Sequence, residues 1–116
     1  MAELRSYRQP LCSGPRMVHP MTVFVVEHSH TQQTCPAANP QLAAGLLQIV
    51  SSKNAAMHGV AIRAEAVANG QHHLYLIVEA ANADVVRSYL APFGQLGSLT
   101  VTPSSSCEEV VQRGAC

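Results

Sequence analysis

Hydrophobic residues gather in four short runs with the composition of β-strands. Residues 22–28 (TVFVVEH) and 74–80 (LYLIVEA) are dense in β-branched and aromatic side chains. Residues 60–68 alternate between apolar and polar positions, and residues 98–102 (SLTVT) form the fourth run. We therefore predict four strands over these segments.

The segment after the first strand carries the signals of a helix. Asn39 followed by Pro40 predicts its start, because asparagine caps helices and proline at the first helical position gives up no hydrogen bond. We expect the helix to fade within residues 51–54 or to run to Met57, with Gly59 as its stop. Its apolar stripe consists of Leu42, Ala43, Leu46, Leu47, Ile49 and Val50.

A second helix is predicted after the third strand. Asn82 caps it, Asp84 favours its positive end, and Pro92 with Gly94 is expected to end it. Its apolar side consists of Val86, Tyr89 and Leu90. A further short helix is expected over residues 108–112.

Asn69-Gly70 predicts a hairpin between the second and third strands, since both residues tolerate positive φ. A strict two-residue loop would place Arg63 and Glu65 on the same face as Leu74 and Leu76. We therefore expect a β-bulge, or a loop longer by one residue.

The order β-α-β-β-α-β predicts an α+β, ferredoxin-like fold, with a four-stranded antiparallel sheet and two helices on one face. The expected core is Phe24, Val26, Ile62, Leu74, Leu76, Val78, Leu99 and Val101. The expected open face is Val23, Val25, Glu27, Arg63, Tyr75, Ile77, Glu79 and Thr100. Because this face is too apolar to leave in water on so small a domain, we expect a homodimer joined through it.

Composition narrows the range of partners. Charged residues make up 12% of the 116-residue chain and hydrophobic residues 47%, and the formal net charge is zero. That balance argues against nucleic acid, because phosphate binding depends chiefly on cations. No stretch approaches the ~18 apolar residues of a membrane span, so no membrane partner is expected.

The chain divides unevenly. Residues 1–20 hold three of the seven basic residues and three of the seven prolines, and we interpret them as a flexible extension. Residues 21–106 form the predicted ferredoxin-like domain, and residues 107–116 a C-terminal tail. The four cysteines lack zinc-finger spacing and no signal peptide precedes them, so a reducing, cytoplasmic setting is expected. A Cys107–Cys116 disulfide stays open, because only geometry decides it.

The candidate chemistry lies at one end of the predicted sheet. The first strand is expected to end at His28, with His30 just beyond it, the third begins near His72 and His73, and the loop with Cys35 leaves the same end. Imidazole and thiolate donors suit nickel, copper or zinc, so these five residues are the candidate metal ligands. Glu27 and Glu79 could act as further ligands or as partners of the imidazole N–H groups.

Other interpretations of these residues stay open. His28 has the core-facing parity and could be a hydrogen-bonded interior histidine, and His73 could simply belong to the hairpin. Alternatively, Cys35 could act as a nucleophile with His30 as its base.

The segments TVFVVEH, LYLIVEAANADVVRSYLAPFG and SLTVTPSSS together resemble small bacterial ferredoxin-like proteins of the dimeric α+β barrel type. These proteins include an uncharacterised family with nickel-binding members. The resemblance covers residues 21 to about 106, implies a homodimer and favours a metal site, without assigning any ligand. The same architecture resembles small oxygenases and isomerases, which implies an alternative function on a small organic substrate.

Overall fold

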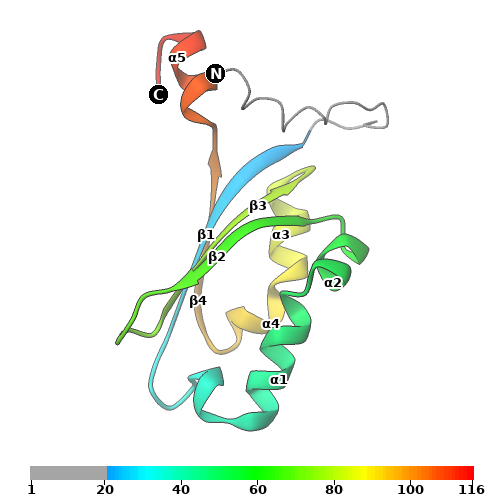
Figure 1. The fold of residues 1–116 in the computed structure, drawn as a ribbon, viewed down its shortest axis with the longest axis vertical. Coiled ribbons are helices and arrows are strands. Elements are labelled where there is room, and N and C mark those ends of the chain that lie inside the picture. Colours follow the sequence, from blue (N-terminus) through cyan, green and yellow to red (C-terminus); the bar gives the residue numbers. More distant parts are fainter. Residues whose placement is uncertain (1–20) are drawn as a thin grey trace.

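The computed structural model describes residues 21–116 and shows a four-stranded antiparallel open sheet in the order β2-β3-β1-β4 (Figure 1). Both β-α-β units cross over as the ferredoxin-like prediction requires, so the α+β fold class is confirmed. The strands are β1 (Thr22–His30), β2 (Ala61–Val67), β3 (His73–Ala80) and β4 (Gly97–Ser104).

Four helices, α1 to α4, cover one face of the sheet (Figure 1). A short 3-10 helix, η3, precedes them, and a separate helix, α5, follows β4. Their bounds are η3 (Pro36–Ala38), α1 (Pro40–Ile49), α2 (Ser52–Met57), α3 (Ala83–Tyr89), α4 (Ala91–Gly94) and α5 (Cys107–Arg113). The expected helix over residues 108–112 is therefore present.

The predicted helix starts are confirmed by their caps. The Asn39 side chain accepts hydrogen bonds from the backbone N–H groups of Gln41 and Leu42, and the Asn82 side chain accepts one from Val85. Each bond satisfies a donor that has no partner within the helix.

The first predicted helix is divided in two. Ser51 has extended backbone angles, and its hydroxyl accepts a hydrogen bond from the N–H of Asn54. This cap ends the run at Val50 and starts α2, which stops before Gly59 at φ 78°.

Pro92 does not end the second helix, contrary to the prediction. Helix α3 ends at Tyr89, and Pro92 lies in the first turn of α4. Proline is tolerated there because first-turn N–H groups have no partner within the helix.

The core lies between the sheet and the helices, as predicted. Buried residues of β1 and β3 pack against Val86, Leu90 and Phe93. The expected core residues Phe24, Val26, Leu74, Leu76 and Val78 are buried, and Ile62, Leu99 and Val101 pack against them.

The predicted β-bulge lies between Ile62 and Ala64. It turns Arg63 to the open face, where its guanidinium lies 2.8 Å from a carboxylate oxygen of Glu79. Glu65 still pairs with Leu76 and stays on the helix side, exposed at the sheet edge. The bulge therefore corrects the parity of Arg63 but not that of Glu65.

The open face carries apolar side chains, with Tyr75 42% and Ile77 41% exposed. At the sheet edge, β4 includes Pro103, which pairs with Phe24 of β1. No helix in the described part of the chain is long and apolar enough to cross a membrane.

Helix α5 stands beyond the end of β4, away from the core (Figure 1). A reciprocal Ser106–Glu109 capping box starts it, Gly114 at φ 75° ends it, and it contains no buried residue. The predicted extension over residues 1–20 lies outside the described residues, and the division of the chain at residue 106 stays a prediction.

Candidate metal centre

Strand β1 presents His28 and His30 on its helix-facing side. Alternation along the strand places them in line with Phe24 and Val26. The strand runs two residues further than predicted, because the N–H of His30 donates to the carbonyl of His72 over 3.1 Å. This bond holds the end of β1 beside the start of β3.

Gly97 lets β4 approach the same end of β1. It pairs with His30, and a Cβ atom at this position would fall 1.8 Å from the carbonyl oxygen of Ser29. Any side chain at Gly97 would therefore displace the backbone that carries His30.

Cys35 reaches the site through a tight turn. The hydroxyl of Thr34 accepts a hydrogen bond from the N–H of Thr31, and the N–H of Thr34 donates to the carbonyl of Thr31. The turn brings the chain back toward the sheet, where Cys35 is the residue before η3.

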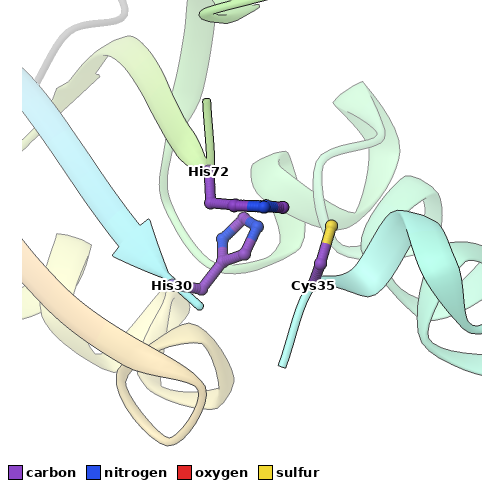
Figure 2. Close-up of side chains that lie close together, drawn as sticks. All are labelled: His30, Cys35 and His72. Carbon is purple, nitrogen blue, oxygen red and sulfur yellow. The ribbon is translucent and has the colours of Figure 1, made fainter. Parts of the chain in front are cut away.

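Figure 2 shows three side chains converging from separate segments: His30 from β1, Cys35 from before η3, and His72 from before β3. One ligand atom from each can be chosen so that all three lie within 4.8 Å of one another. The His30 and His72 rings are 5.1 Å apart between centroids, at 60°. His30 and Cys35 are half-buried, whereas His72 is exposed.

The imidazole ring of His30 lacks hydrogen-bond partners among the described residues. Both of its ring nitrogens are shielded from solvent, and neither has a hydrogen-bond partner among residues 21–116. Burial lowers the pKa of His30 below its ordinary value, and positive charge on His28 or His72 lowers it further. The imidazole is therefore kept in the neutral form that binds metals.

His28 lies behind the cluster rather than in it. It is 1% exposed, and its Nε2–H donates to the carbonyl of Phe93 over 2.8 Å. Burial lowers the pKa of His28, although the bond to Phe93 acts in the opposite direction. Its ring packs on His30, with centroids 5.3 Å apart, and supports that ring from the core side.

His73 lies on the opposite face of the sheet. Its Nδ1 is 2.8 Å from the Ser29 hydroxyl, and its Nε2 is 3.2 Å from a carboxylate oxygen of Glu27. Neighbouring residues of a strand point to opposite faces, so the His72-His73 pair is divided between the cluster and the open face. Glu27 and Glu79 have their partners on that open face and do not reach the cluster.

A cavity of about 380 Å³ adjoins the cluster. All three clustered residues line it, together with His28 and an apolar wall. That wall includes Pro36, Leu46, Val67, Leu74 and Phe93. Sequence reasoning missed it because it combines η3, α1, α4 and the β2–β3 hairpin, which only the tertiary fold brings together.

The nucleophile interpretation of Cys35 gains nothing from this geometry. Neither ring nitrogen of His30 has a hydrogen-bond partner among the described residues, so no hydrogen bond joins the Cys35 thiol to this base. The helix after Cys35 is only three residues long and offers little dipole to stabilise a thiolate.

Residues 24–115 match a protein family described as a domain of unknown function, DUF3303. No curated protein and no solved structure matches the chain. The family description names neither a fold nor a metal, so a function has to be inferred from the site.

Proposed function

Because the chain belongs to the DUF3303 family, whose description names no activity, we propose a function from its site: the protein binds a transition metal ion through His30, Cys35 and His72. The observation that carries the proposal is that both ring nitrogens of His30 are buried and have no hydrogen-bond partner among the described residues. Leaving a buried polar group without a partner typically costs about 1–3 kcal/mol, and a bound ion would remove that cost for the ring nitrogen that ligates it.

The donor set favours nickel, copper or zinc. Two neutral imidazoles and a thiolate are common ligands of these borderline-soft ions. In a tetrahedral site with bonds of about 2.0–2.3 Å, ligand atoms are about 3.5 Å apart. The three ligand atoms already lie within 4.8 Å of one another, so movements of about 1 Å would bring them to these distances, and the exposed His72 can supply part of that movement. The layout resemblance to a family with nickel-binding members supports nickel among the three.

Three protein ligands leave a coordination position free. Structural zinc sites are usually closed by four protein ligands, whereas sites that act on a ligand keep one position open. Handling or sensing of a metal, or chemistry on a bound ligand, therefore fits this arrangement better than a purely structural ion.

Metal analysis of tag-free protein tests the proposal. Chelator-treated protein dialysed against Ni²⁺, Cu²⁺ or Zn²⁺ should retain near-stoichiometric amounts of at least one ion. His30→Ala should lower retention strongly, whereas His58→Ala, a change of the same type outside the cluster, should not. Failure to retain any of the three ions, or equal losses in both variants, would overturn the proposal.

The cavity favours a second candidate, a small oxygenase or isomerase acting on a small organic substrate. Its described lining contains no Asp, Glu, Lys or Arg, so acid–base work would fall to the histidines. Such an activity would persist in chelator-treated protein.

We also propose that a second copy of the chain covers the open face. Tyr75 and Ile77 are exposed there, while Glu27 and Glu79 are already paired within their own chain. A second copy would therefore bury apolar surface without burying an unpaired carboxylate.

A further inference from the structure

A metal ion held by His30, Cys35 and His72 would not fill the cavity of about 380 Å³ that lies beside these residues. We propose that the cavity binds a small organic monocarboxylate, whose carboxylate group ligates the ion and whose apolar body fills the cavity. This inference rests on the proposed metal site. The inference follows from position, charge and size.

Position links the ion to the cavity. All three proposed ligands belong to the cavity lining, so an ion held between them borders the same space. The coordination position that the protein leaves free is then available to a molecule in the cavity. His28 also lines the cavity, but its Nε2–H is engaged by Phe93 and cannot bind such a ligand.

Charge selects the head group. A divalent ion with one thiolate and two neutral imidazoles carries a net charge of +1. No other fixed charge lies among the described lining residues. A monoanion would neutralise the site, whereas a neutral ligand would leave +1 and a dianion would leave −1. The apolar surroundings make this difference larger than it would be in water.

Size and lining select the body of the ligand. The cavity volume of about 380 Å³ lies toward the lower end of small-molecule sites, which typically span about 300–1,000 Å³, so a small ligand fits. The wall formed by Leu46, Val67, Leu74 and Phe93 offers contacts to carbon rather than to hydroxyl groups. A carboxylate with an aromatic ring or a short alkyl chain matches both properties.

Cobalt-substituted protein allows the two proposals to be tested separately. The visible spectrum of Co²⁺ reports its ligands, so titration with Co²⁺ alone first tests the site of His30, Cys35 and His72. Benzoate is then titrated into the loaded protein. A saturable change in the cobalt spectrum is expected, with affinity at least tenfold higher than for acetate, which has the same head group but little apolar surface. Benzamide, which is uncharged, should also bind at least tenfold more weakly.

A matched pair of variants tests the cavity. Val67→Gln replaces an apolar lining residue that is already half-exposed, and should weaken benzoate binding by about three- to tenfold while Co²⁺ binding is unchanged. Val111→Gln makes the same change on α5, away from the cavity, and should alter neither.

Each result bears on one proposal. Normal Co²⁺ binding without a spectral response to benzoate overturns the ligand assignment and leaves the metal site standing. Equal affinities for acetate and benzoate overturn the role of the cavity, and benzoate binding of equal strength to metal-free protein overturns the role of the ion. Stronger binding of inorganic phosphate than of benzoate overturns the charge argument. Absence of Co²⁺ binding overturns the metal site and the ligand assignment with it.

Discussion

The adjacent residues His72 and His73 point to opposite faces of the sheet, and this difference decides which of them lies in the cluster. His72 belongs to the cluster with His30 and Cys35, while His73 hydrogen-bonds with Ser29 and Glu27 on the other face. They have the same side chain and are neighbours in sequence, so each is the natural control for the other.

Alanine substitution of this pair should separate metal binding from fold. His72→Ala should weaken binding of Ni²⁺, Cu²⁺ or Zn²⁺ by at least tenfold, because one of three ligands is lost. Because His72 is exposed, its loss should change the free energy of unfolding by less than about 0.5 kcal/mol. His73→Ala should leave metal affinity within about twofold. Competition titration with a chromophoric chelator measures both, and an equal loss in the two variants would contradict the division of the pair.

Tyr89 gives a pH-dependent test of the helix layer, away from the candidate site. Its hydroxyl donates to the carbonyl of Ile49 at the end of α1, and burial, reinforced by the charge of Glu65, raises its pKa to about 12. Unfolded tyrosine loses its proton near pH 10. Stability from this residue should therefore be complete below pH 10 and be lost as the pH rises toward 12.

The expected loss is about 2–3 kcal/mol in the free energy of unfolding. Urea denaturation at intervals between pH 9 and pH 12 measures it. Tyr89→Phe should cost about 1 kcal/mol at neutral pH, but should flatten the alkaline decline. The Ile49 carbonyl keeps a hydrogen bond from Asn54 in that variant, so no acceptor is left unsatisfied. An equally steep decline in Tyr89→Phe would show that other groups cause it.

At the scale of elements, the site depends on how closely β4 approaches the end of β1. Gly97 lies opposite His30, and its missing side chain permits backbone contact with Ser29. The position of the proposed ligand His30 therefore depends on Gly97, which is distant in sequence and is not itself a proposed ligand.

Gly97→Ala should therefore affect both stability and metal binding. The added Cβ meets backbone atoms, which cannot rotate away, so a loss of about 1–3 kcal/mol is expected. Displacement of His30 should weaken metal binding several-fold. Gly45→Ala is the matched control, because its Cβ meets nothing within 4 Å and alanine in a helix should add about 0.5–1 kcal/mol. Chemical denaturation and metal titration of both variants provide the measurements, and unchanged metal affinity in Gly97→Ala would refute this role of β4.

At the scale of the whole molecule, the two faces of the sheet differ in how fully they are covered by other elements. The helix side of the sheet has a closed core, while the open face and α5 have no partner surface within the described residues. An isolated helix of seven residues is marginal in water, so α5 is also expected to gain from a second copy.

The proposed dimer should be sensitive to charge on the open face. Wild-type protein should sediment as a dimer at micromolar concentration. Ile77→Glu should raise the dissociation constant of the dimer at least tenfold, because a carboxylate would be buried without a partner. Leu47→Glu, at a 69% exposed position on α1, should leave the dimer intact. Analytical ultracentrifugation distinguishes these outcomes, and a monomeric wild type would refute the covered face.

Periodicity and capping residues were enough to predict most of this architecture, since strands, helix starts and the bulge follow from local chemistry at Asn39, Asn82 and the 60–68 run. The end of the sheet that holds the cluster followed from topology. Which of His28 and His30 belongs to the cluster did not, because both residues share one face of β1 and only the packing of α4 over the sheet separates them. The carbonyl that engages His28 lies 65 residues away, and no local pattern marks it.

Each edge of the sheet carries a feature that hinders strand addition. Pro103 offers no N–H to an incoming strand beside β4, and the bulge in β2 interrupts the regular spacing of the opposite edge between Ile62 and Ala64. Copies of the chain therefore meet poor templates for extending one sheet into another. Association should stop at a finite, face-to-face assembly, so the apolar surface is compatible with high concentration without growth of continuous β-fibrils.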